Sequence, residues 1–218
     1  MKYVNLHTHT SNNLPNTIEI INQYPHEFRD DFSTYSIGIH PWYIEEGRLA
    51  SDLKIIKSKL SSNKCIALGE CGFNLSAIDK IYSTQIDAFE AQLDINRTFL
   101  KPVILHCVAS FDEVILSKKN SGLSCPFILH GFSKNAQVAS QLLNQDFYLS
   151  FGKYLLRNPE LGKVFAQIPN EKIFLETDTM TESLEEVYTF AAQCRNISLE
   201  EMQSIVWENY QRVFGRED

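Results

Sequence analysis

Six short apolar runs in this chain each end in a histidine, glutamate or aspartate, and this repetition constrains the fold more than any other feature. The runs cover residues 3–9, 37–40, 66–70, 103–106, 127–130 and 173–178. They are apolar almost throughout instead of alternating with polar residues, which is typical of strands that are buried on both faces. Segments with helical spacing lie between them, so the sequence predicts an α/β fold with a parallel sheet.

The polar ends of these runs favour a TIM-like (β/α) barrel over a doubly wound sheet. In a barrel, side chains at the carboxyl ends of many different strands meet at one mouth. Seven strands are clear, and we expect the eighth to be short or missing near residues 180–183, which would distort the barrel. The expected strands are 3–7, 35–40, 65–70, 102–106, 126–130, 147–151 and 172–178. The expected helices are 50–60, 82–100, 111–119, 136–144, 159–166, 182–194 and 199–214, the last with a capping box from Ser198 to Glu201.

Length and composition predict a single enzyme-sized domain covering residues 1–218. The formal charge of −7 argues against a broad electrostatic grip on a nucleic-acid backbone, but it allows an enzyme that touches a strand end or a small phosphate ester. The five cysteines are odd in number and form no CxxC pair, which predicts reduced thiols. Without a signal peptide or an apolar span, the expected location is cytoplasmic with no membrane partner, and the oligomeric state is left open.

The histidines cluster at the strand ends and predict a metal site. Of the six histidines, only His26 lies away from an expected strand end. The other five are His7, His9, His40, His106 and His130. His7 and His9 are two residues apart, so on a strand they point to the same side and can reach one ion. Imidazoles and carboxylates together bind one or two divalent ions, for which magnesium, manganese and zinc are the candidates.

Two carboxylates have expected roles in this chemistry. A divalent ion lowers the pKa of a bound water so that hydroxide forms near neutral pH, and two ions can clamp the oxygens of a phosphoryl group. Glu70 is the best candidate for a carboxylate that bridges two ions. Asp178 suits the role of accepting the proton of the attacking water, with helix N-capping as the alternative. Glu176 shares strand parity with Asp178 and is a candidate for orienting a ligand histidine.

Four further residues are candidates for substrate contacts. His40 can bind metal, donate a hydrogen bond to substrate, or simply pack under Trp42. Lys134, Lys153 and Arg157 follow expected strands five and six on loops, where they can hold a phosphate. The alternative for these three cations is an ordinary solvated surface.

The ordered set of motifs resembles the TatD-type metal-dependent deoxyribonucleases, a branch of the amidohydrolase-like metallohydrolases. The matching stretches are 7–9, 38–42, 69–73, 85–93, 102–106, 130–133, 175–178 and 208–214. The resemblance covers essentially the whole chain and implies a TIM-like barrel with a mono- or dinuclear site. It also implies phosphodiester hydrolysis, often of DNA from a 3′ end with magnesium or manganese.

Position by position, the resemblance implies a ligand set in which every member is present. It makes His7, His9, Glu70 and Asp178 ligands of one metal, and Glu70, His106 and His130 ligands of a second, with Glu70 bridging. It places His40 in the pocket. The departures from the family pattern are Asn5, Asn74, the run 107–110 and the shortened turn after Asp178. These departures are expected around the substrate instead of the metals.

We therefore expect a TatD-like metal-dependent hydrolase, most simply a phosphodiesterase or DNA exonuclease that uses a metal-activated water, with single-stranded DNA ends as candidate substrates. Asp178 and Glu70 are the expected catalytic residues. One alternative is hydrolysis of a small amide, ester or lactone on the same barrel, because barrels do not fix the substrate. Another is a non-catalytic binding protein that keeps metal for stability.

Overall fold

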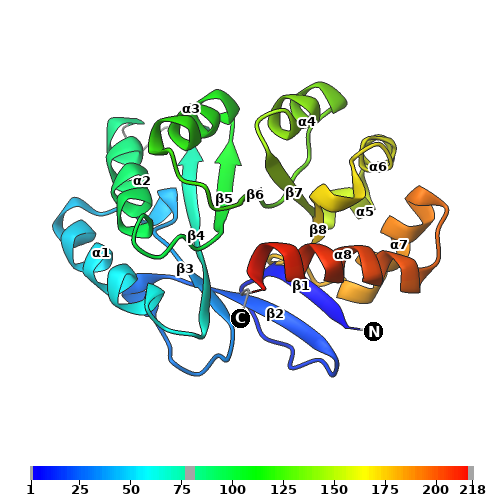
Figure 1. Ribbon diagram of the computed structural model, residues 1–218, viewed down its shortest axis with the longest axis horizontal. Coiled ribbons are helices and arrows are strands. Elements are labelled where there is room, and N and C mark those ends of the chain that lie inside the picture. The colour runs from blue at the N-terminus through cyan, green and yellow to red at the C-terminus, as the bar shows by residue number, and fades with distance from the viewer. Residues whose placement is uncertain (1, 77–81, 216–218) are drawn as a thin grey trace. The chain divides into compact units, whose positions relative to one another are not determined.

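The computed structural model describes residues 2–76 and 82–215, and the chain divides into two compact units (Figure 1). The first unit holds residues 2–21 and 129–215, and the second holds residues 22–128. The chain passes from one unit to the other within two of its strands, β2 and β6.

The first unit combines the first strands of the chain with its C-terminal part. Its elements are β1 (Tyr3–Thr8), β2 (Thr17–Gln23), α4 (Ala136–Leu143), β7 (Phe147–Phe151), α5 (Lys153–Arg157), α6 (Pro159–Phe165), η3 (Asn170–Lys172), β8 (Ile173–Leu175), α7 (Leu184–Arg195) and α8 (Leu199–Phe214). Helix α8 packs against β1 and β8. The last two residues of β2 belong to the second unit.

The second unit alternates strands and helices in the same way. Its elements are η1 (Pro25–Glu27), β3 (Tyr35–Ile37), η2 (Pro41–Tyr43), α1 (Glu46–Leu60), β4 (Cys65–Asn74), α2 (Tyr82–Asn96), β5 (Val103–Val108), α3 (Phe111–Ser121) and β6 (Phe127–Leu129). Helices α1, α2 and α3 pack against β3, β4 and β5.

The strands follow one another in the sheet in chain order from β1 to β8. The pairs β1–β2, β3–β4, β4–β5 and β7–β8 are parallel. The chain just after β8 also lies beside β1, because the Asp178 amide donates to the His7 carbonyl at 2.9 Å. Parallel strands in chain order with intervening helices have the connectivity of a TIM-like barrel. The predicted fold class is therefore confirmed.

Two details of the sequence-based prediction are wrong. The eighth strand is β2, which the prediction omitted, and residues 180–183 form no strand. The stretch after β7 is also more regular than expected, since Lys153 and Arg157 are the first and last residues of α5 instead of loop residues.

Apolar and aromatic side chains fill the core of each unit. In the first unit the Phe151 ring meets those of Phe132 and Phe165 at centroid distances of 5.5 and 4.9 Å. In the second unit the Phe73 and Phe89 rings meet edge to face at 5.1 Å. Such edge-to-face pairs add to the stabilisation from apolar burial. These contacts hold the strands in place. The polar side chains project from the carboxyl ends of those strands.

None of the five cysteines, all within the described residues, forms a disulfide, as the composition predicted. Burial raises the pKa of the Cys65 thiol to about 12, so this side chain is a neutral packing group at physiological pH. Within residues 2–76 and 82–215, no helix combines the length and apolar character that crossing a membrane requires.

Candidate metal centre

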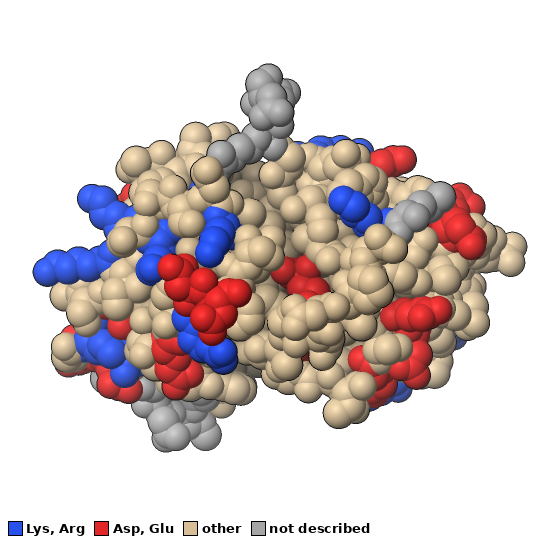
Figure 2. Space-filling view, turned by 90° about the horizontal axis from the view of Figure 1, so that it is seen from below, with Lys and Arg blue, Asp and Glu red and all other residues tan. Residues whose placement is uncertain are grey.

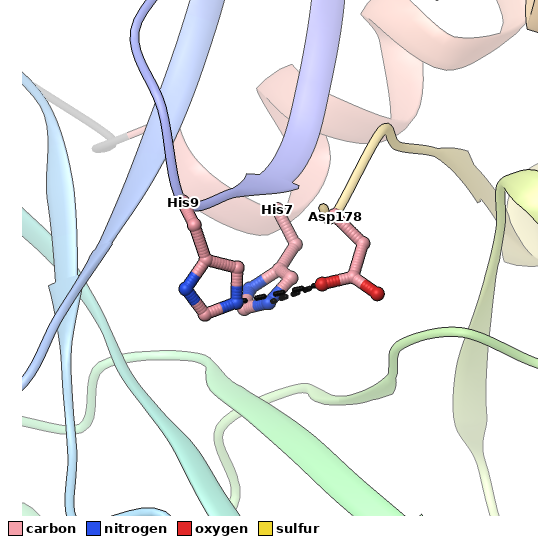
Figure 3. A group of neighbouring side chains, drawn as sticks. All are labelled: His7, His9 and Asp178. Carbon is pink, nitrogen blue, oxygen red and sulfur yellow. Dashed lines mark ion pairs between the residues drawn. The ribbon is translucent and has the colours of Figure 1, made fainter. Parts of the chain in front are cut away.

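The end of β1 places two imidazoles beside one carboxylate in the first unit (Figure 3). His7 is the fifth residue of the strand and is fully buried, whereas His9 lies just beyond the strand and is partly exposed. The Nε2 atoms of His7 and His9 lie 3.9 and 3.4 Å from Asp178 Oδ1. The predicted convergence of these three side chains is therefore present within one unit.

Backbone hydrogen bonds fix Asp178 at this position. Its amide donates to the His7 carbonyl at 2.9 Å, and the His9 amide donates to the Asp178 carbonyl at 3.3 Å. Just before it, the Asn5 side chain holds Thr177 at both ends, with Nδ2 donating to Oγ1 at 2.8 Å and Oδ1 accepting from the amide at 2.9 Å. Asp178 itself has a φ of 53°, a left-handed conformation that aspartate adopts more readily than most residues. Helix α7 starts only at Leu184 with Ser183 as its N-cap, so Asp178 is not a cap.

Neighbouring positive groups keep the Asp178 carboxyl ionised. Burial alone raises its pKa, but a hydrogen bond with His9 and the charges of His130, His7 and Lys153 outweigh burial and lower the pKa below the usual value. Lys153, at the start of α5, places Nζ 3.2 Å from Asp178 Oδ2. The site therefore carries a carboxylate with an ammonium group beside it.

His130 and Glu176 form a second pair in the first unit. Glu176 is 1 % exposed, and its Oε1 accepts from the Gly131 amide at 2.8 Å and lies 3.3 Å from His130 Nδ1. A carboxylate facing Nδ1 favours the tautomer with the proton there, so the lone pair is on Nε2. The rings of His130 and His7 lie 4.3 Å apart. His130 is thus held beside His7 with a nitrogen lone pair that can bind metal.

The second unit also carries a carboxylate–histidine group. Glu70 Oε1 lies 2.7 Å from His106 Nδ1 and 3.4 Å from His40 Nε2. The Glu70 amide donates to Asn22 Oδ1 at 2.8 Å, which fixes the backbone of this buried residue. On the other side of the His106 ring, Asn74 Nδ2 lies 3.1 Å from Nε2.

One ring nitrogen of His40 faces the Glu70 carboxylate and the other is hydrogen-bonded to the backbone. Its Nδ1 accepts from the Trp42 amide at 3.0 Å, so in the neutral ring the proton sits on Nε2, the atom that faces Glu70. His40 is 3 % exposed and its ring lies 4.9 Å from that of Trp42. His40 therefore does pack against Trp42, which was one of the alternatives for this residue. Its contact with substrate stays a prediction.

The donor sets of both units fit a divalent ion. In the first, the nitrogen and oxygen atoms of His7, His9 and Asp178 all lie within 4.8 Å of one another. Ligand atoms bound to one ion at about 2.1 Å lie roughly 3 to 3.5 Å from each other, so only a small side-chain adjustment would close this set. His40, Glu70 and His106 in the second unit meet the same 4.8 Å condition. Imidazole with carboxylate suits zinc and manganese, and carboxylate also suits magnesium.

The predicted phosphate-binding cations lie in different surroundings. Lys153 contacts Asp178 directly, as described above. Arg157, at the end of α5, donates through Nε and Nη2 to Glu182 Oε1 at 3.1 and 2.6 Å. Lys134 is exposed in the segment between β6 and α4. Contact of any of the three with substrate stays a prediction.

Two groups near these sites escaped the sequence reasoning. Asn74 beside His106 was noted only as a departure from a family pattern, although it is the last residue of the strand that carries Glu70. An aromatic cluster around Tyr24, His26 and Tyr43 also adjoins His40. His26 was set aside because it lies at no strand end, and the cluster forms only when η1 and η2 come together in space.

The family described as TatD related DNase matches residues 1–215. The chain belongs to this family. Among curated relatives, the metal-dependent hydrolase YabD of Bacillus subtilis is 27 % identical over 90 % of this chain and 81 % of its own length. YcfH of Escherichia coli, also described as a metal-dependent hydrolase, is 25 % identical over 84 % of this chain and 74 % of its own length.

Solved structures of TatD proteins share the fold. The TatD homologue YjjV of Escherichia coli matches 98 % of both chains with a TM-score of 0.84 at 18 % identity. A TatD family hydrolase from Entamoeba histolytica matches 99 % of both chains with a TM-score of 0.81 at 16 % identity. This TatD-family chain is a metal-dependent hydrolase with candidate histidine, glutamate and aspartate ligands.

Proposed function

We propose that this TatD-family hydrolase cleaves phosphodiester bonds, with the end of a single-stranded DNA as the substrate. The observation that carries the proposal is the group of His7, His9 and Asp178 with Lys153 beside the carboxylate. The two imidazoles and the carboxylate suit a divalent cation, and the ammonium suits an anionic substrate group.

Each side chain of the first unit has a role in this proposal. A bound divalent ion would supply an activated water and stabilise negative charge on phosphoryl oxygens. His7 and His9 hold that ion, and Asp178 both binds it and accepts a proton, because its lowered pKa keeps it ionised at neutral pH. Lys153 places positive charge 3.2 Å from Asp178 Oδ2, where it can pair with a phosphate oxygen.

The second unit offers a further donor group. Glu70 and His106 hold a divalent ion in the proposal, and His40 orients the Glu70 carboxylate through Nε2. The bridging role that the family resemblance implies for Glu70 stays a prediction. The stoichiometry of metal binding gives the number of ions. Measuring it with the donor residues of one unit mutated at a time shows which group holds each ion.

The charge of the chain favours a strand end over a long duplex. The formal charge is −7, and on the face drawn in Figure 2 acidic and basic side chains lie among each other with uncharged residues over most of the surface. Tight duplex binding requires many phosphate contacts from lysine and arginine. A phosphorus substrate also agrees with a neighbour in fold, a phosphotriesterase homology protein of Escherichia coli described with phosphate in its active site, at a TM-score of 0.70 and 13 % identity.

The test is hydrolysis of an end-labelled single-stranded oligonucleotide by metal-stripped protein, with magnesium, manganese or zinc added back. We expect stepwise shortening from one end that requires metal and falls at least about 1000-fold in Asp178→Asn, because both a ligand and a proton acceptor are lost. The control is Asp87→Asn, which makes the same chemical change at an exposed position of α2 and should keep full activity.

Three other results would contradict the proposal. Full activity in Asp178→Asn would remove the assigned proton acceptor. Cleavage of carboxylic esters or lactones without cleavage of phosphodiesters would establish the alternative substrate class. Metal binding without turnover of any of these substrates would establish a binding protein.

A further inference from the structure

The short helix η2 exposes two large aromatic side chains. Trp42 is 54 % exposed and Tyr43 is 39 % exposed. The other tryptophan of the chain, Trp207, behaves differently, because its ring stacks on Tyr210 at 5.5 Å with an interplanar angle of 21°. A single exposed apolar side chain is common on protein surfaces, so the exposure of Trp42 gains meaning only from the side chains next to it.

Trp42 lies directly beside the carboxylate–histidine group of the second unit. Its ring centroid is 4.9 Å from that of His40 and 5.9 Å from that of His106. Both imidazoles contact Glu70 Oε1. The interplanar angles of 68° and 62° show that neither imidazole lies flat on the indole. A ligand held near Glu70 and His106 would therefore have an exposed aromatic ring next to it.

The backbone that carries Trp42 is fixed before any ligand binds. Its amide donates to His40 Nδ1 at 3.0 Å, and the next amide, of Tyr43, donates to the His40 carbonyl at 2.9 Å. Arg48 Nη2 donates to the Tyr43 carbonyl at 2.9 Å. The Tyr43 ring packs on those of Tyr24 and His26 at 4.9 and 5.5 Å. Because this backbone is already ordered, a ligand that contacts Trp42 pays a smaller conformational-entropy cost on binding.

We propose that Trp42 is the stacking surface for a nucleobase of the substrate, next to Glu70 and His106. The inference rests on the proposed function and narrows it, because it requires a phosphodiester that carries a flat aromatic base. Stacking on an exposed aromatic side chain is tolerant of base identity, since every base has a π-face. Trp42 thus gives preference for nucleotides over simple phosphodiesters without sequence preference.

Fluorescence tests the contact directly. The chain has two tryptophans, so Trp207→Phe leaves Trp42 as the single indole reporter. The probes are the dinucleotide dTpdT and an analogue in which a tetrahydrofuran ring replaces each thymidine sugar and base, each titrated into the full chain with and without magnesium. We expect dTpdT to quench the Trp42 emission and the abasic analogue to leave it unchanged. Equal quenching by both probes, or none by either, overturns the proposal.

Kinetics supply the second readout. In Trp42→Ala we expect the KM for dTpdT to rise about 10-fold with little change in kcat, and the KM for the abasic analogue to stay unchanged. Trp42→Phe keeps a ring and should recover part of the loss. The matched control is Tyr82→Ala, which removes another exposed aromatic side chain of the same unit and should leave both constants unchanged.

The outcomes separate this inference from the proposed function. If neither substrate is cleaved, the proposed function fails, and the fluorescence titration still decides whether Trp42 stacks on a base. If both substrates are cleaved and Trp42→Ala raises both KM values equally, phosphodiester hydrolysis stands and the stacking role is wrong.

Discussion

At the scale of single residues, the buried carboxylate of Glu176 explains how His130 is held. Oε1 takes the Gly131 amide and faces His130 Nδ1, so the same oxygen fixes a backbone turn and an imidazole tautomer. Strand parity indicated this orienting role from the sequence. The turn contact was not foreseeable, because it depends on where the chain after β6 lies in space.

Replacing Glu176 by glutamine tests this positioning role. The amide oxygen of glutamine can keep the Gly131 contact, but the negative charge that polarises His130 is lost. We expect metal affinity to fall about 10-fold, with unchanged far-UV circular dichroism. Isothermal titration of the metal-stripped variant checks this, and Glu185→Gln on the exposed side of α7 is the control. Equal affinities in both variants would show that Glu176 is only a packing residue.

At the scale of elements, the path of β4 depends on the glycine before Glu70. Gly69 has a φ of +135°, and a Cβ at this position would lie 2.3 Å from the Ile104 carbonyl oxygen on β5. Only glycine fits there, and its neighbour is the residue that faces His40 and His106. The close packing of β4 on β5 and the position of Glu70 are thus parts of one local arrangement.

Two glycine substitutions compare this constraint with an unconstrained site. Gly69→Ala should lower the free energy of unfolding by about 3 kcal/mol, from backbone strain together with the clash on β5. Gly47→Ala in α1 meets nothing within 4 Å and should raise it by about 0.5 kcal/mol through helix propensity. Chemical denaturation of both variants measures the difference. A Gly69→Ala protein as stable as Gly47→Ala would show that β4 tolerates a side chain here.

Comparison of the strands with the sequence shows which signals were sufficient to predict a strand. Continuous apolar runs predicted the strands that carry His7 and His106 and the strand that ends just before His130. The sequence TIEIINQ of β2 interrupts such a run with polar residues, and these have structural partners. Glu19 accepts from Ser11 Oγ at 2.9 Å, Asn22 accepts from the Glu70 amide, and Gln23 accepts from the Arg29 amide at 3.0 Å. Because polar groups that serve other segments look like solvent-exposed residues, the pattern concealed this strand.

The sequence also predicted some helices well and missed others. The sequence predicted α8 with its correct ends, and Ser198 caps it by accepting from the Glu201 amide at 3.1 Å. The full reciprocal capping box occurs instead at Ser183 and Glu186, which begins α7. Helix α5 has only five residues, too few for a hydrophobic period to be visible. Local sequence signals were therefore enough to locate long helices. Short helices could not be located in this way, because their formation depends on tertiary contacts.

At the scale of the whole molecule, chemistry is concentrated at the carboxyl ends of parallel strands. Each unit carries its own group of imidazole and carboxylate donors, His7 with His9 and Asp178 in the first and Glu70 with His106 in the second. The strand-end pattern predicted that histidines and carboxylates gather at the carboxyl ends of the strands. Family membership shows a metal-dependent hydrolase, whereas phosphodiester cleavage is our proposal.

The most direct test of the central claim is calorimetric titration of manganese and zinc into metal-stripped wild-type protein, Asp178→Asn and Asp87→Asn. We expect tight binding to the wild type and to Asp87→Asn, with the same stoichiometry in both. We expect an affinity at least about 10-fold weaker, or one ion fewer, in Asp178→Asn, because His7 and His9 then lack their carboxylate partner. Identical titrations for all three proteins would contradict the assignment of His7, His9 and Asp178 as a metal-binding group.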